Sequence, residues 1–250
     1  MYLRQATAGK NWKIATIGGH NIHISPFFLI LIGLFVFMGL NSSADFFYQL
    51  MWAPVLFFSI LFHELGHAAA TKKCGFGTSK ILLHGFGGVA MNRRGHTKPK
   101  QGIFIALAGP GVTLILAVLS LAGLIVYGFA TGGEPANMAV SVLGHFLLLM
   151  TMANFFWLIL NLLPIYPMDG GQTMMYWLRK RGARQNEAIV KSAKISLVAI
   201  GITAILTLMV FQVGGFLIII IFAMFGYMNW QILQQAKAGG GPNRGPMRFG

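Results

Sequence analysis

Long apolar runs, separated by short polar segments, dominate the pattern of this chain. A transmembrane helix needs about 20 consecutive and mostly apolar residues, and by this measure the pattern predicts about six spans. They are expected over residues 25–40, 50–71, 102–129, 138–163, 195–211 and 214–232. Only Gln212 and Val213 separate the last two runs, so these two spans should form a tight antiparallel hairpin.

Two polar segments between the runs have the pattern of β-hairpins. Residues 12–25 (WKIATIGGHNIHIS) place Gly18 and Gly19 between two β-prone stretches, and residues 80–92 (KILLHGFGGVAMN) have a similar pattern. Irregular loops are the alternative. The predicted fold class is therefore an all-α, multi-pass membrane protein with small β-hairpin elements on its cytoplasmic side.

Composition agrees with a membrane protein. Of the 250 residues, 56% are hydrophobic and 10% are charged, whereas a soluble domain carries about 25% charged residues. We expect a cytoplasmic N-terminal segment over 1–24, a membrane-embedded domain over 25–236, and a disordered tail over 237–250 that is rich in Gly, Pro and Arg.

The basic residues predict the orientation of the chain. All 19 Lys and Arg fall before the first predicted span, between the second and third, between the fourth and fifth, or after the last. Because Lys and Arg concentrate in cytoplasmic loops, both termini should be cytoplasmic. The net charge of +14 is then explained by topology and by attraction to anionic lipids, rather than by a nucleic-acid partner.

The second predicted span contains the sequence FHELGHAAA, residues 62–70. His63 and His67 are four residues apart, so both imidazoles lie on one face of a helix and can bind one metal ion. Glu64 is adjacent and can act as a general base. An ionisable group inside a span is costly and usually functional. The alternative is a set of polar residues that only form hydrogen bonds between packed helices.

A catalytic zinc usually has three protein ligands, so a third donor is required. Asp169 is the best candidate, because it follows the fourth predicted span in NLLPIYPMDGGQ, between two prolines and two glycines that break the helix. The alternative is an aspartate that caps a helix starting at Gly170. The remaining histidines fit less well, with His84 as the reserve; the others are His20, His23, His96 and His145.

These motifs together resemble the site-2 protease family of intramembrane metalloproteases. The resemblance covers roughly residues 18–172 and includes HELGH, NLLPIYPMDGG, ALAGPG (106–111) and HGFGGVA (84–90). It implies hydrolysis of membrane proteins within or near their transmembrane helices, and one Zn²⁺ ion per chain bound by His63, His67 and Asp169. It also implies Glu64 as the catalytic base. Asn161 matches an asparagine that contacts the substrate backbone or the oxyanion, with hydrogen bonding between helices as its alternative.

Other functions and several properties stay open at this point. A membrane metal transporter could also place His and Asp in its spans, and a non-catalytic membrane scaffold could keep the same fold. The sequence leaves the oligomeric state undecided, a homo-oligomer included. A prokaryotic cell membrane is expected for so short a chain, and the loop after the third predicted span is too short for a PDZ domain.

Overall fold

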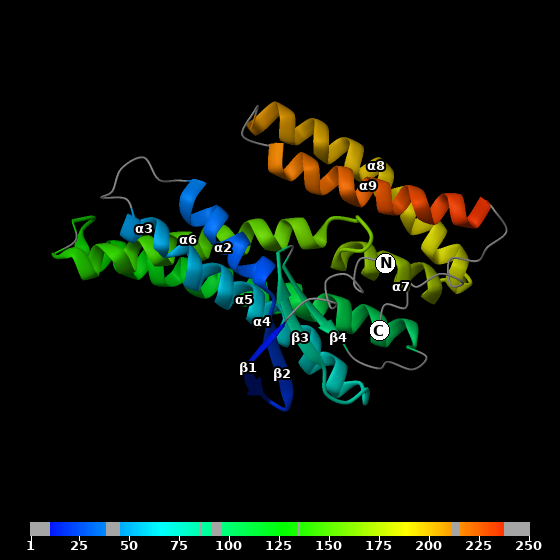
Figure 1. The fold of residues 1–250 in the computed structure, drawn as a ribbon, viewed down its shortest axis with the longest axis horizontal. Coiled ribbons are helices and arrows are strands. Elements are labelled where there is room, and N and C mark those ends of the chain that lie inside the picture. Colours follow the sequence, from blue (N-terminus) through cyan, green and yellow to red (C-terminus); the bar gives the residue numbers. More distant parts are fainter. Residues whose placement is uncertain are drawn as a thin grey trace. The chain divides into compact units, whose positions relative to one another are not determined.

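The computed structural model describes residues 11–38, 46–85, 87–91, 97–134, 136–211 and 216–237, and these residues are mostly helical (Figure 1). The helices are α2 (Pro26–Met38), α3 (Phe46–Leu50), α4 (Trp52–Lys73), α5 (Pro99–Thr131), α6 (Met138–Leu162), α7 (Asp169–Lys180), α8 (Gln185–Phe211) and α9 (Phe216–Lys237). The strands are β1 (Trp12–Ile17), β2 (His20–Ile24), β3 (Lys80–His84) and β4 (Gly87–Met91).

The chain divides into two compact units. The first, called here the sheet unit, contains Tyr2–Arg94 and Ala108–Ile159. The second, called the C-terminal unit, contains Gly95–Leu107 and Leu160–Gly250. Helices α5 and α6 contribute residues to both, and each unit is described by itself below.

Both predicted hairpins are present in the sheet unit. Strands β1 and β2 pair antiparallel through a turn at Gly18 and Gly19, whose φ angles of 60° and 88° favour glycine. Strands β3 and β4 also pair antiparallel. The sequence pattern missed that β2 and β3 pair in parallel, which joins the two hairpins into one four-stranded sheet of order β1-β2-β3-β4 within the described residues.

The core of the sheet unit lies between the sheet and helices α2 and α4. Apolar side chains from both strands of the inner pair, β2 and β3, meet apolar side chains of the helices in one cluster. Its fully or nearly fully buried members are Ile22, Phe28, Ile60, Leu61, Ala68, Ile81, Leu83 and Ala90. This packing fixes the sheet against the part of α4 that carries HELGH.

Helix α4 packs closely against α5 at a glycine. A Cβ at Gly66 would lie 2.7 Å from the carbonyl oxygen of Ala108, so only glycine allows this approach. Small residues commonly let membrane helices come into backbone contact. The contact sets the HELGH turn of α4 beside the ALAGPG segment of α5.

The C-terminal unit is built on the pair α8 and α9, which lie side by side (Figure 1). The predicted hairpin of the last two spans is therefore present, although α8 begins at Gln185, ten residues before the predicted 195–211. Its predicted connection, Gln212 and Val213, lies outside the described residues. Ile165, Ile200 and Phe222 form a buried cluster that joins the helices to the segment before α7.

Within the described residues, four helices are long and apolar enough to cross a membrane. They cover Phe46–Lys73, Pro99–Thr131, Met138–Leu162 and Gln185–Met209. The expected count of about six is therefore not confirmed. Within the run at 25–40 the described residues form the 13-residue helix α2, and residues 39 and 40 lie outside the described residues.

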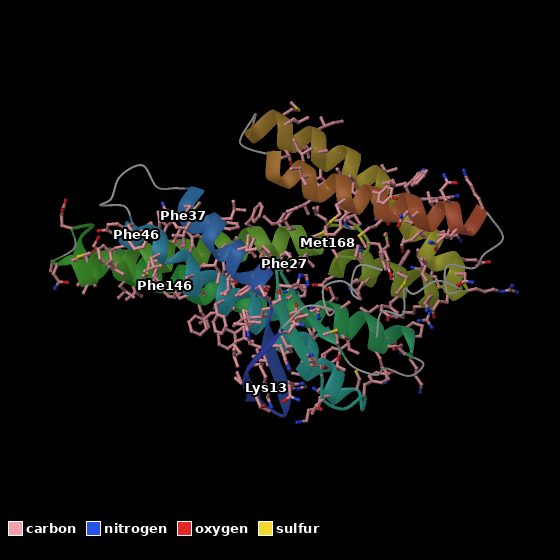
Figure 2. All side chains as sticks on the ribbon, viewed as in Figure 1. Lys13, Phe27, Phe37, Phe46, Phe146 and Met168 are labelled. Carbon is pink, nitrogen blue, oxygen red and sulfur yellow. The ribbon has the colours of Figure 1, made fainter. Side chains whose placement is uncertain are left out.

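The helices carry apolar side chains on their outer surfaces, as a membrane protein does. Figure 2 labels Phe27 and Phe37 of α2, which are 64% and 68% exposed. Phe46 at the start of α3 is also exposed. The predicted tail after Lys237 lies outside the described residues.

Candidate metal centre and active site

His63 and His67 converge on one buried point of the sheet unit. They lie one turn apart on α4, and their rings meet edge to face with centroids 4.8 Å apart. Their Nε2 atoms are 3.1 Å apart, and the side chains are only 4% and 8% exposed. The predicted placement of both imidazoles on one helix face is therefore present in the structure.

Thr113 of α5 orients the ring of His63. Its hydroxyl oxygen lies 2.8 Å from Nδ1 of His63, and the hydroxyl donates to the carbonyl oxygen of Gly109, at 3.2 Å. Since the hydroxyl proton is used in that second bond, Nδ1 of His63 is the donor in the first. The lone pair of His63 is then on Nε2, which is the atom that faces His67. No sequence pattern singled out Thr113, which is marked only by its place four residues after Gly109.

Gly109 leaves the space in front of the two histidines open. A Cβ at this position would collide with Nε2 of His67 and lie 2.8 Å from Nε2 of His63. Gly109, in the ALAGPG segment, therefore directly borders the two candidate ligand atoms.

These atoms fit a tetrahedral zinc ion. Two nitrogens bound to one such ion at about 2.05 Å lie about 3.3 Å apart, close to the observed 3.1 Å between His63 and His67. Two imidazole nitrogens this close require a proton or a cation between them, because their lone pairs otherwise repel. His63 already has its proton on Nδ1, which suits a metal ligand held by a second hydrogen bond.

Glu64 is buried between α4 and strand β4. Its side chain is 6% exposed, and a Cβ at Gly88 would collide with its Cγ and lie 2.8 Å from its Oε1. The glycine-rich segment of the second hairpin therefore lets β4 lie directly on this carboxylate. Gly88 is a further position whose role the sequence pattern left unspecified.

Asp169 and Asn161 belong to the C-terminal unit. Asp169 is 7% exposed and is the first residue of α7. Met168 occupies the N-cap position of this helix and its side chain makes no capping hydrogen bond. Asn161 is half-buried in the last turn of α6. Their meeting with the histidines remains a prediction.

Asn154 of α6 has a structural role. Its side chain is fully buried, and Nδ2 donates to the hydroxyl of Ser59 on α4, at 3.0 Å, and to the carbonyl of Met150, at 2.8 Å. It joins two helices and gives no sign of a role in chemistry.

The remaining histidines have other surroundings. His20 is buried and its Nδ1 accepts the backbone N–H of Ser79 at 2.9 Å, which ties the first hairpin to the start of β3. His84 ends β3, and burial lowers its pKa below the ordinary value. His145 stacks edge to face on Tyr48, and His96 lies outside the described residues.

Comparisons with known proteins converge on one family. The family described as Peptidase family M50 matches residues 51–134 and 128–208. A zinc metalloprotease of Methanocaldococcus jannaschii is 32% identical over 81% of this chain and 53% of its own length. The stage IV sporulation protein FB of Bacillus subtilis is 29% identical over 64% of this chain and 48% of its own length.

A solved structure is also similar. The site-2 protease from Methanocaldococcus jannaschii aligns with a TM-score of 0.56 and 25% identity, over 90% of this chain and 95% of that one. The chain spans little more than half the length of the first curated relatives it matches, 59% and 53%.

Proposed function

This chain belongs to peptidase family M50, and we propose that it is an intramembrane zinc metalloprotease. It would hydrolyse peptide bonds within or near the transmembrane segments of membrane proteins. The observation that carries the proposal is the 3.1 Å approach of the His63 and His67 Nε2 atoms, on a buried helix that also carries Glu64. The names of the relatives, which include a zinc metalloprotease and a site-2 protease, support it.

One zinc ion would be held by His63, His67 and Asp169. The two imidazoles supply Nε2 atoms, and a catalytic zinc needs a third protein ligand. Asp169 is a buried carboxylate in the first turn of α7. A buried carboxylate is costly unless it meets a positive charge or a hydrogen-bond donor, which supports a role as ligand.

The ion would act as a Lewis acid and lower the pKa of a water molecule to about 7. The carboxylate of Glu64 would take a proton from the attacking water. The oxygen of that water would at the same time add to the scissile carbonyl carbon of the substrate. Glu64 would then return that proton to the leaving amine nitrogen as the C–N bond breaks. The amide of Asn161 would donate a hydrogen bond to the substrate backbone or to the developing oxyanion.

The edge of β4 is a suitable docking place for substrate. Among the described strands, β4 pairs on one side only, with β3. A transmembrane substrate hides its carbonyls in helical hydrogen bonds and must unwind before attack. The extended segment could then add to the β4 edge by main-chain hydrogen bonds, and Gly88 on that strand borders Glu64.

The membrane arrangement that we propose has about six spans with both termini in the cytoplasm. The alternation of all 19 basic residues supports it, as do the apolar helices α2 and α9, which add to the four that qualify by length. His63 and His67 lie in the second half of α4, so the site would face the cytoplasmic side. Similar proteins in an archaeon and a bacterium support a prokaryotic cell membrane.

The test compares the wild type with Glu64→Gln in detergent, with zinc content and peptide-bond cleavage measured in both. The reporter is a single apolar transmembrane segment with a glycine pair in its cytoplasmic third. Glu134→Gln is the matched control, because Glu134 lies in the turn after α5. We expect wild type and Glu134→Gln to cut, and Glu64→Gln to keep one zinc per chain without cutting.

Two outcomes would contradict the proposal. If the wild type holds no zinc, the metal centre is wrong. If Glu64→Gln cuts as fast as the wild type, Glu64 is not the base. Zinc uptake into sealed vesicles that contain a zinc-sensitive dye would instead favour the transporter, and zinc binding with neither cleavage nor uptake would favour the scaffold.

A further inference from the structure

Helices α8 and α9 together hold the backbone of one residue, Tyr166, in the segment before Asp169. The N–H of Tyr166 donates to the hydroxyl oxygen of Ser196 on α8, at 2.8 Å. The carbonyl oxygen of Tyr166 accepts from Nδ2 of Asn229 on α9. Both main-chain polar groups of one residue are thus bound by side chains from two different helices of the same unit.

The two side chains that hold Tyr166, called here the clamp, are buried, and each makes a further hydrogen bond within its own helix. Ser196 and Asn229 are both 0% exposed. The hydroxyl of Ser196 donates back to the carbonyl of Ser192 at 2.7 Å, and Nδ2 of Asn229 also bonds the carbonyl of Phe225 at 2.8 Å. Polar side chains are costly in such helices unless they satisfy a partner, and here that partner is the loop.

At Asn229 the free-energy cost of burying a polar side chain is not fully offset. Its Oδ1 is buried without a hydrogen-bond partner among the described residues. An apolar side chain of similar size would avoid the penalty, and α9 does not need an amide for its own helical bonds. The amide is therefore explained by the bond to Tyr166 rather than by the stability of α9.

Hydrogen bonds and a close backbone contact link Tyr166 to the residues that lead to Asp169. The N–H of Met168 bonds the carbonyl of Ile165 at 2.8 Å, and the side chain of Gln172 on α7 bonds the carbonyl of Pro167 at 2.9 Å. A Cβ at Gly171 would collide with the backbone nitrogen of Tyr166. The first turn of α7 therefore lies directly on the clamped residue, and Met168 marks this segment in Figure 2.

We propose that Ser196 and Asn229 are positioning residues that act through Asp169. By holding Tyr166, the pair α8–α9 sets the place of the Asp169 carboxylate as the third metal ligand. The inference rests on the proposed function, because it needs Asp169 to bind the ion. It assigns to the last two helices a role in holding the metal centre as well as in crossing the membrane.

The experiment measures zinc affinity by competition with a chelator of known affinity, on full-length protein in detergent at constant pH. The variants are Ser196→Ala and Asn229→Leu. Thr203→Ala is the control, because among the described residues the Thr203 hydroxyl on the same helix bonds the carbonyl of Ala199 and no other group. Loss of a group that orients a ligand typically costs about 10–100-fold in metal affinity. We expect such a loss in both variants, none in the control, and recovery in Ser196→Thr.

A double-mutant cycle separates positioning from general loss of structure. If Ser196 acts through Asp169, adding Ser196→Ala to Asp169→Asn should weaken zinc binding no further than Asp169→Asn alone. If the two losses multiply, Ser196 serves the fold only and the inference is wrong. A thermal melt of each variant excludes chains that do not fold.

Failure of the inference can be told from failure of the proposed function. A wild type that binds no zinc, or Asp169→Asn with unchanged affinity, overturns the assignment of the metal ligands. Zinc bound by the wild type, lost in Asp169→Asn, and unchanged in both Ser196→Ala and Asn229→Leu overturns the clamp alone.

Discussion

His63 donates from Nδ1 to the hydroxyl of Thr113, which lies 50 residues later in the chain, at 2.8 Å. The hydroxyl donates a hydrogen bond to the carbonyl oxygen of Gly109, which leaves a lone pair on its oxygen to accept from Nδ1 of His63. The metal-binding lone pair of His63 is thereby placed on Nε2, toward His67. Hydrogen bonds of this kind fix the tautomer and the ring orientation of histidine ligands in metal sites.

Replacing Thr113 with valine should weaken zinc binding. Valine has nearly the same shape but no acceptor, so Nδ1 of His63 loses its partner and the ring its orientation. We expect a fall of about 10–100-fold in zinc affinity, measured by chelator competition. Thr151→Val is the control, because the Thr151 hydroxyl bonds only the carbonyl of Leu147 on its own helix. Equal affinity in the wild type and Thr113→Val would contradict this role.

Replacing Gly109 with alanine should close the site. The added methyl group would occupy the space in front of the His67 and His63 Nε2 atoms, and backbone motion is resisted by the contact of Gly66 with Ala108 on the same helix. We expect zinc content in the purified protein to fall well below one ion per chain.

Gly111→Ala is the matched control for this change, since no atom lies within 4 Å of a Cβ at Gly111. It should keep its zinc, because alanine is the better helix former. Loss of zinc in both variants would mean that α5 tolerates no substitution here, and the specific role of Gly109 would be unsupported.

Low pH should lower the stability of the folded state through His20, a residue of strand β2. Burial, and to a lesser degree the positive charge of Lys72, lowers the pKa of His20 from the ordinary value of 6.5. Below pH 6.5 the imidazole of His20 therefore binds fewer protons in the folded state than in the unfolded state. Stability is complete above pH 6.5 and is lost as the pH falls toward the lower pKa of the folded state. Protonation would also remove the Nδ1 acceptor that binds Ser79.

The measurement is the Tm of the wild type and of His20→Asn at pH 7.5 and at pH 5.5. The Oδ1 of asparagine can accept the Ser79 N–H but does not titrate. We expect the wild type to lose more of its Tm between the two pH values than His20→Asn does. An equal loss in both proteins would show that other groups cause the acid sensitivity.

Both hairpins could be predicted locally, because Gly18 and Gly19 provide the positive φ angles that a tight turn needs. The parallel pairing of β2 with β3 could not be predicted in this way. It joins segments separated by α2 and α4, and strand pairing at that distance depends on how the helices between them pack. Residues 39 and 40, the predicted end of the first span, lie outside the described residues, so the length of that span stays a prediction.

Part of the candidate site could also be predicted from the sequence. The spacing of His63 and His67 determines that they share a helix face, whatever surrounds that helix. Thr113, Gly109 and Gly88 carry no such local signature. Each matters only because α5 or β4 lies against α4, as the bonds and close approaches at these positions show.

The sequence by itself therefore determined the class of protein and the shared helix face of His63 and His67. It also predicted Glu64 as the base and Asp169 as a further ligand, and these two roles stay predictions. These follow from hydrophobic length, helical period and the cost of charge in a span, which are local properties. Only the tertiary structure decided that Thr113 orients His63 and that Ser196 and Asn229 bind Tyr166. Such contacts join distant segments, and a hydrogen bond between them depends on packing that no local pattern encodes.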